Sequence, residues 1–266
     1  MSTQEPRQPG SELSKELELA LGMADAADAI TMSRFGSSSL EVQTKPDHTP
    51  VTDADTSTEQ ALRLMLGQER PGDAVLGEEY GSTDPSNPRQ WILDPIDGTK
   101  NYLRGVPVWA SLIGLSVDGI PVVGVVSAPA LGRRWWAALG LGAWSRTLGG
   151  EPQQLHASAV VDLSQASLSY SDAIGWHEPR LNALLAGTAR QRAYGDFWSH
   201  MLVAEGAVDI AAEPELGTWD MAALIPIIRE AGGVATAFDG GDPLAAGSLV
   251  ATNALLHAQV LELLHS

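Results

Sequence analysis

The segment from Trp91 to Tyr102 constrains the fold of this chain more than any other. Its apolar start, Trp91 to Leu93, predicts a short buried strand. Pro95 has no N–H to donate to a sheet ladder, so we expect the strand to stop there. Gly98 lets the backbone approach a ligand closely, and the Thr99 hydroxyl can cap the free amides of a helix that begins there.

Two carboxylates, Asp94 and Asp97, lie beside this expected helix start. A helix N-terminus favours a phosphate because its backbone N–H groups are unpaired. Paired carboxylates favour hard cations such as Mg2+, which often bridge to substrate phosphates. Neighbouring anion and cation sites are what metal-assisted hydrolysis of a phosphate ester requires. The alternative from these residues alone is an Asp-Pro-x-Asp-Gly turn with two solvated acids.

The sequence Trp-x-x-Asp-Pro-Ile-Asp-Gly-Thr-x-Asn-Tyr, unbroken from Trp91 to Tyr102, resembles the first motif of the inositol monophosphatase family of magnesium-dependent phosphatases. Two further elements are similar to motifs of that family, Gly77-Glu78-Glu79 and Trp219-Asp220-Met221-Ala222-Ala223. The resemblance extends over residues 15–260 of the chain, and twelve positions with so many matches make the first motif highly specific.

The resemblance implies a set of metal ligands and catalytic groups. The implied ligands are the side chains of Glu78, Asp94, Asp97 and Asp220 together with the carbonyl of Ile96. The implied catalytic residues are Thr99, Glu78 and Asp55, which hold or polarise a water that attacks phosphorus directly, without a covalent enzyme intermediate. The implied cofactor is Mg2+, two or three ions per site, for which Mn2+ can substitute. Such ions lower the pKa of water and neutralise charge on the leaving oxygen.

The spacing of these acids is physically reasonable apart from the family. Glu78 and Asp94 end two successive predicted strands, so both side chains can point into one crevice beyond the strand ends. Asp220 opens a predicted helix far along the chain and would clamp the metals from the second half. Alternatives remain open: Asp220 can be a helix N-terminal acid favoured by the helix dipole, and Glu78 and Asp55 can be solvated surface acids.

The stretch from Gly195 to Asp209, together with Trp91 to Leu115, resembles the histidinol-phosphatase branch of the family found in actinobacteria. Its Asp196-Phe197-Trp198 suits a substrate with a cation and a flat ring. The resemblance implies hydrolysis of L-histidinol phosphate to L-histidinol and phosphate in histidine biosynthesis, with Asp196 or Glu213 at the amine or imidazole. The implied substrate contacts are Asp97, Gly98, Thr99, Gly195, Asp196, Glu213 and Asp220. Alternatives are an inositol-1-monophosphatase or another small phosphomonoesterase, a non-catalytic regulator on the same fold, and, for Asp196, a helix N-cap acid.

Composition excludes several other classes of function. The net charge of −17 disfavours binding to nucleic acid or to an anionic membrane, and the absence of cysteine excludes disulfides and thiolate metal sites. Neither a signal core nor a membrane-length apolar run is present, so we expect a cytoplasmic protein. The sequence also lacks a Gly-x-Ser-x-Gly elbow, a Walker loop and a His-x-x-x-His pair. Gly140-x-Gly142 is interpreted as a turn, and Asp53-Ala-Asp55 lacks the apolar strand that precedes the nucleophile of haloacid dehalogenase-type phosphatases.

By resemblance the fold class is α/β (α+β), a layered αβαβα sandwich of the inositol monophosphatase/fructose-bisphosphatase type, and the protein forms a homodimer. We divide the chain into a disordered tail (1–10), an N-terminal α+β metal-binding part (11–150) and a C-terminal α/β substrate part (151–266) that form one catalytic unit, with Gly149 to Pro152 as the boundary. Hydrophobic periodicity and turn residues predict the elements. Helices are expected at 11–35, 56–68, 178–185, 196–205, 219–231 and 254–264. Strands are expected at 40–44, 74–76, 91–93, 110–117, 120–128, 133–139, 143–148, 167–171, 191–194, 208–212, 234–237 and 248–252.

Overall fold

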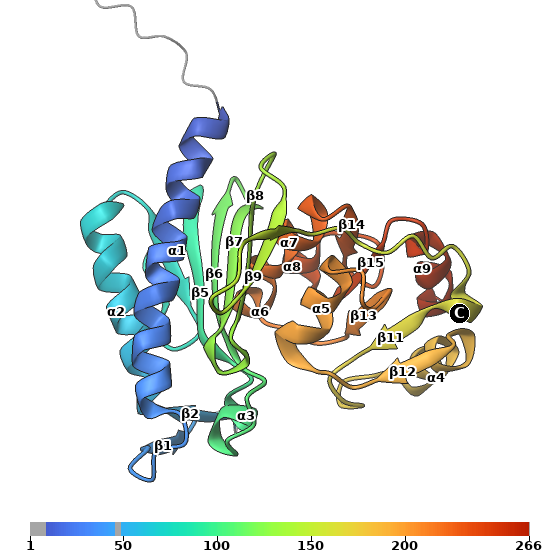
Figure 1. Ribbon diagram of the computed structural model, residues 1–266, viewed down its shortest axis with the longest axis horizontal. Helices are drawn as coiled ribbons and strands as arrows, with labels where there is room; N and C mark the ends of the chain where they lie inside the picture. Colours follow the sequence, from blue (N-terminus) through green and yellow to red (C-terminus); the bar gives the residue numbers. More distant parts are fainter. Residues whose placement is uncertain (1–8, 46–48, 266) are drawn as a thin grey trace, which may run out of the picture.

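A computed structural model describes residues 9–45 and 49–265 and shows helices and sheets in alternating layers (Figure 1). α1 and α2 cover one face of a large sheet, and α5, α6 and α7 lie between this sheet and a smaller one. α4 and α9 cover the outer face of the smaller sheet. The helices are α1 (Pro9–Arg34), α2 (Asp53–Glu69), α3 (Thr99–Leu103), α4 (Glu178–Gly187), α5 (Asp196–Ala204), α6 (Thr218–Ala222), α7 (Leu224–Glu230), α8 (Pro243–Ala246) and α9 (His257–His265). The expected αβαβα sandwich is confirmed.

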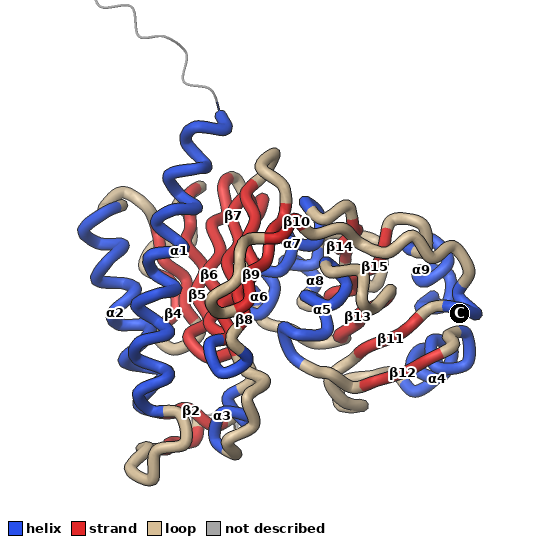
Figure 2. The backbone as a smooth tube through the Cα atoms, in the orientation of Figure 1, coloured by secondary structure: helices blue, strands red, loops and turns tan. Residues whose placement is uncertain are grey.

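The large sheet has eight strands in the order β10-β9-β8-β7-β6-β5-β3-β4 (Figure 2). Its neighbouring strands are antiparallel except β3 and β5, which are parallel. Residues that follow β3 and residues at the end of β5 therefore leave the sheet at the same edge. The strands are β3 (Ala74–Gly77), β4 (Gly81–Ser82), β5 (Arg89–Asp97), β6 (Ala110–Val117), β7 (Ile120–Ala128), β8 (Arg133–Ala138), β9 (Ala143–Thr147) and β10 (Gln153–Gln154).

The smaller sheet has five strands in the order β12-β11-β13-β15-β14. β12, β11 and β13 are parallel, whereas β15 is antiparallel to β13 and β14. The strands are β11 (Ser167–Ser169), β12 (Arg190–Arg192), β13 (Ile210–Glu213), β14 (Gly233–Thr236) and β15 (Leu249–Asn253). A separate hairpin of β1 (Val42–Thr44) and β2 (Pro50–Thr52) precedes α2, and two 3-10 turns span Pro129–Leu131 and Leu163–Gln165.

Two glycines decide how closely the middle helices approach the large sheet. Gly114 of β6 and Gly124 of β7 lie opposite each other in the ladder. A Cβ on Gly124 would lie 2.1 Å from the carbonyl oxygen of Ala223, and one on Gly114 would lie 3.0 Å from the carbonyl carbon of Ala222. Only glycine permits this contact, which brings α6 and its Asp220 against the end of β5.

For two elements, the predicted bounds are wrong near a proline. β5 does not stop at Pro95 but continues to Asp97 through a bulge, in which the residues between Asp94 and Asp97 face only Ser111 of β6. The bulge removes the need for an N–H at Pro95. The helix expected over 219–231 is instead α6 and α7, which break at Ala223, because Pro226 has no N–H to donate to the carbonyl of Ala222.

Other boundaries differ less. α2 begins at Asp53 rather than Thr56, since Thr52 caps it in a capping box with Asp55. α1 begins at Pro9 rather than at residue 11, and α9 begins at His257 rather than at residue 254. α8 was not predicted. Both hairpins, 110–128 and 133–148, are confirmed.

Residues 1–8 of the expected tail and residues 46–48 of the loop before β2 lie outside the described residues. Among the helices that the structure describes, none is long and apolar enough to cross a bilayer. The division of the chain at Gly149 to Pro152 stays a prediction; beyond it, β10 still pairs with β9 of the large sheet.

Candidate active site

Three carboxylates, Asp94, Asp97 and Asp220, meet where β5 leaves the large sheet. Each offers an oxygen that lies within 4.8 Å of the other two. Asp94 and Asp97 come from the bulge at the end of β5, and Asp220 comes from the first turn of α6. The structure therefore brings together three of the four side chains that were predicted as metal ligands.

Backbone amides hold each of these carboxylates in place. Asp94 Oδ1 accepts a hydrogen bond from the Ile96 N–H at 2.9 Å, and Asp220 Oδ2 accepts one from the Gly217 N–H at 2.7 Å. Asp97 Oδ2 accepts from the N–H of Phe197 at 2.8 Å, which links the end of β5 to the first turn of α5. Each of these bonds leaves the second oxygen of the carboxylate available to a ligand.

The electrostatics of the cluster favour a cation. Burial raises the pKa of Asp94 and Asp97 well above the ordinary value, and neighbouring carboxylates raise both pKa values further. Burial also raises the pKa of Asp220 to about 7. Several carboxylates packed without a counter-charge destabilise one another's ionised forms, and a divalent cation relieves this repulsion. The donor set consists of oxygens alone, so it fits a hard cation such as Mg2+.

Glu78, the fourth predicted ligand, follows β3 and lies close enough for its charge to raise the pKa of Asp94. Its Oε1 accepts from Lys45 Nζ at 2.6 Å, and the same ammonium lies 2.8 Å from Glu79 Oε1. Burial would lower the pKa of Lys45, but hydrogen bonds to the two glutamates raise it overall. Lys45 was missed as a site residue, because a lone lysine in a polar loop carries no sequence signal.

Glu59 of α2 was also missed, and it holds the turn that carries Glu78. Its side chain is 0% exposed, and its oxygens accept from the N–H of Glu79 at 2.8 Å and the N–H of Tyr80 at 3.2 Å. The Nε of Arg63 pairs with it at 2.7 Å. A signal was present: Glu59 precedes Leu62 and Leu66 at helical spacing, so an acid lies on the buried face of this helix.

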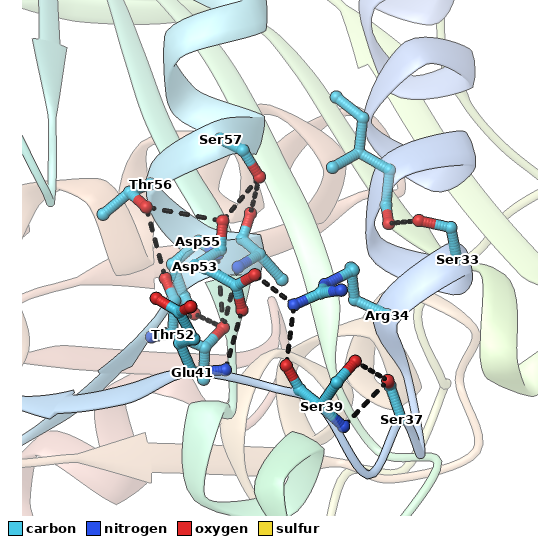
Figure 3. A network of polar contacts seen from close by, with 12 residues as sticks. Ser33, Arg34, Ser37, Ser39, Glu41, Thr52, Asp53, Asp55, Thr56 and Ser57 are labelled. Carbon is cyan, nitrogen blue, oxygen red and sulfur yellow. Dashed lines mark hydrogen bonds and ion pairs between the residues drawn. The ribbon is translucent and has the colours of Figure 1, made fainter.

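Asp55 and Thr99 lie together as the resemblance implied. Asp55 is fully buried in the first turn of α2, where its Oδ2 accepts from the Thr52 N–H at 2.9 Å (Figure 3). The Thr99 hydroxyl lies 3.4 Å from Asp55 Oδ1 and donates to the Ile96 carbonyl at 3.0 Å. Burial raises the pKa of Asp55 to about 6, although hydrogen bonds from Thr52 oppose the shift. The predicted capping by Thr99 is wrong: Gly98 is the N-cap of α3, and no side chain caps that helix.

Gly98 is a position that only glycine can fill. Its φ is +83°, and a Cβ would lie 3.0 Å from the Val108 carbonyl and 3.2 Å from Asp196 Oδ2. The same Asp196 oxygen accepts from Asn101 Nδ2 at 2.8 Å, so the start of α3 lies against the start of α5. Gly98 and Asp196 were both predicted substrate contacts, and the structure places them side by side.

Asp196 and Glu213 are joined through Ser171. The N–H of Asp196 donates to Ser171 Oγ at 2.8 Å, and that hydroxyl donates to Glu213 Oε1 at 2.8 Å. Burial raises the pKa of Asp196 to about 6 and the pKa of Glu213 to about 7. The alternative that Asp196 is a helix N-cap is wrong, because Gly195 is the N-cap of α5 and Asp196 is its first helical residue.

Two adjoining cavities open beside the carboxylates. An outer cavity of about 550 Å3 is lined by Glu78, Gly98, Thr99, Gly195 and Tyr194 among others. An inner cavity of about 140 Å3 is lined by residues that include Asp97, His200 and Glu213. Ser171, Asp196 and Asp220 line both, so the cavities meet at the acidic cluster. All predicted substrate contacts line one cavity or the other.

Comparisons with known proteins show the family of the chain. Residues 12–266 match the model of the inositol monophosphatase family. The chain is 56% identical to a histidinol-phosphatase of Mycobacterium tuberculosis, covering 94% of this chain and 98% of that protein. It is 52% identical to a histidinol-phosphatase of Streptomyces coelicolor, covering 92% and 95%.

Solved structures show the same fold. The extragenic suppressor protein suhB of Bartonella henselae superposes with a TM-score of 0.85 at 27% identity, covering 94% of this chain and 98% of that one. An inositol monophosphatase from Anabaena superposes with a TM-score of 0.81 at 27% identity, covering 96% of each chain. This chain therefore belongs to the inositol monophosphatase family and is a phosphoric monoester hydrolase.

Proposed function

We propose that the protein hydrolyses L-histidinol phosphate to L-histidinol and phosphate. The observation that carries the proposal is the inner cavity, where Glu213 and Asp196 form an acidic wall next to the carboxylate cluster. This wall suits a phosphate ester that carries an amine close to its phosphate. The relatives from M. tuberculosis and S. coelicolor carry the name histidinol-phosphatase over nearly the whole length of this chain. The reaction belongs to histidine biosynthesis, and we place the protein in the cytoplasm for that reason.

Enzymes of this family depend on metal ions, and the donor set here supports Mg2+. In the proposal, Glu78, Asp94, Asp97, Asp220 and the Ile96 carbonyl hold two or three Mg2+ ions, for which Mn2+ can substitute. When bound, the metal supplies positive charge that neutralises the phosphoryl group and lowers the pKa of a water. Glu78, which pairs with Lys45 in the structure, would also hold this positive charge.

Thr99 and Asp55 orient the attacking water in this proposal. The Thr99 hydroxyl lies between Asp55 Oδ1 and the Ile96 carbonyl, so its oxygen can accept from a water while its proton is held. Asp55 is buried and has a raised pKa of about 6, which suits it to hold a proton passed through Thr99 near neutral pH. Glu78 lines the outer cavity together with Thr99 and also helps to polarise the water.

The two cavities accommodate the two ends of the substrate. Gly98 and Thr99 contact the phosphate at the cluster, and Gly195 lets the chain turn tightly before Asp196. Asp196 or Glu213 meets the amine, and the imidazole extends into the outer cavity towards Tyr194. We further propose that two copies form a homodimer, which light scattering of the purified protein tests directly.

A substrate panel tests the function. Phosphate release is measured with Mg2+ from L-histidinol phosphate, inositol 1-phosphate, fructose 1,6-bisphosphate and adenosine 3′,5′-bisphosphate. We expect the highest kcat/KM for L-histidinol phosphate. A tenfold preference for inositol 1-phosphate, about 1.4 kcal/mol, would refute the assignment and favour an inositol-1-monophosphatase.

A second experiment distinguishes an enzyme from a non-catalytic regulator on the same fold. Asp97→Asn removes one carboxylate charge but keeps an oxygen that can accept from Phe197 N–H. We expect this variant to fold and to lose turnover. Equal turnover in the variant and the wild type would show that the cluster does no chemistry.

A further inference from the structure

His200 lies at the wall of the inner cavity with both ring nitrogens unused. The residue is 1% exposed, and neither Nδ1 nor Nε2 has a hydrogen-bond partner among the residues that the structure describes. Buried polar groups are nearly always hydrogen-bonded in folded proteins, because an unpaired one has lost its bonds to water without gaining others. A side chain with two such atoms beside a cavity therefore indicates a partner that enters the cavity.

The position of His200 on α5 ties it to the substrate residues. It follows Asp196, the first residue of α5, by four residues, and both side chains line the inner cavity. Glu213 reaches the same cavity from β13 and is held by Ser171. Apart from Asp97 and Asp220 of the cluster, the cavity thus presents the imidazole of His200 and the carboxylates of Asp196 and Glu213, which come from α5 and β13.

These groups suit an occupant with several N–H donors. The carboxylates of Asp196 and Glu213 only accept hydrogen bonds when ionised, and burial holds the pKa of His200 at about 4, so its ring is neutral near pH 7. A neutral imidazole has one acceptor nitrogen and does not repel a cation. A primary ammonium carries three N–H groups, which matches one imidazole and two carboxylates.

We propose that His200 is a specificity-determining residue, whose ring nitrogen accepts a hydrogen bond from the ammonium group of the substrate inside the inner cavity. This inference rests on the proposed function. In L-histidinol phosphate the amine is on the carbon next to the ester carbon, so it stays near the phosphate. The inner cavity adjoins the cluster through Asp97 and Asp220, and its 140 Å3 suit a small group. The imidazole of the substrate has the larger outer cavity.

Paired substrates and variants test this role. His200→Phe keeps an aromatic ring and removes both nitrogens, and His200→Leu repeats the change in a smaller volume. His200→Asn and His200→Gln each restore an acceptor, at the positions of Nδ1 and Nε2. Met201→Leu is the control, since Met201 is buried on the same helix but packs in the apolar core instead of lining the cavity. The esters are L-histidinol phosphate and its amine-free analogue, 3-(imidazol-4-yl)propyl phosphate.

We expect His200→Phe and His200→Leu to lower kcat/KM for L-histidinol phosphate at least tenfold, mainly through KM. The amine-free ester should change less than threefold in the same proteins. His200→Asn or His200→Gln should recover most of the loss, and Met201→Leu should behave as wild type on both esters. Equal losses on the two esters would show a merely structural role, and no loss on either would also overturn the inference.

A measurement on the wild-type protein covers the case in which the apolar variants do not fold. In protein labelled with 15N-histidine, unlabelled L-histidinol should shift the ring nitrogens of His200, and an unchanged resonance would refute the hydrogen bond. Failure of the proposed function is seen separately, in the substrate panel with wild-type enzyme. Wild type that prefers L-histidinol phosphate, with His200→Phe unaffected, would overturn only the inference about His200.

Discussion

Glu59→Gln should destabilise the protein although it changes a single atom. The two oxygens of Glu59 accept from three donors: Glu79 N–H, Tyr80 N–H and Arg63 Nε. A glutamine places an NH2 group at one of the two oxygen positions, so a buried donor must face another donor there. Burying an unsatisfied donor costs about 1–3 kcal/mol, and the guanidinium of Arg63 also loses its charged partner.

Together, the unsatisfied donor and the lost ion pair should lower the free energy of unfolding by about 3 kcal/mol. For a chain of this length, about 2–4 °C of melting temperature is lost per kcal/mol, so we expect a fall of roughly 6–12 °C. Thermal unfolding followed by circular dichroism measures it. Glu69→Gln is the matched control, since it makes the same change at an exposed position near the end of the same helix and should shift stability by less than about 0.5 kcal/mol.

The same substitution should weaken magnesium activation. Glu79 follows Glu78 directly, so the amides that Glu59 holds fix the turn that presents Glu78 to the cluster. We expect the Mg2+ concentration for half-maximal activity to rise at least tenfold in Glu59→Gln. A melting temperature within about 2 °C of wild type, together with unchanged magnesium activation, would refute the reasoning that this carboxylate supports the site.

Three further predictions concern the site itself. Thr99→Val should lower kcat by about a hundredfold with little change in KM, because it removes the hydroxyl beside Asp55; a kcat within twofold of wild type contradicts the role of Thr99. At a hundred times its Kd, Mg2+ should raise the free energy of unfolding by about 2.7 kcal/mol, while NaCl of equal ionic strength should not. Asp220→Asn should reduce this stabilisation by Mg2+. Equal stabilisation by the two salts would contradict the metal site. Burial raises the pKa of Glu213 to about 7, so its carboxyl gains a proton as pH falls through 7 and KM for L-histidinol phosphate should rise there. The phosphate of the substrate titrates in the same range, so the amine-free ester serves as the control for that effect. In Glu213→Gln, the pH dependence of KM should be the same for both esters. If the two esters still differ in this variant, another group causes the pH dependence.

The sequence alone determined the local chemistry of this protein. Asp94, Asp97, Gly98 and Thr99 were found from one motif because their spacing along the chain is short and each residue type has a specific backbone or ligand role. Most hairpins and helices also follow from hydrophobic periodicity and turn residues. The bulge at Pro95 depends on the neighbouring strand β6, whereas Pro226 is itself a local signal for the helix break, which the predicted helix over 219–231 overlooked.

Only the tertiary structure decided which distant residues meet. Gly124 carries no motif, yet it lets α6 approach the sheet and thereby brings Asp220 to Asp94. Lys45 is part of the site only because it pairs with Glu78 and Glu79, which are distant in the sequence. His200 likewise becomes a candidate only because other parts of the chain complete the cavity that it lines. Periodicity reports which face of an element is buried, whereas contacts between elements depend on how the layers pack, and a single sequence does not encode that packing in any local pattern.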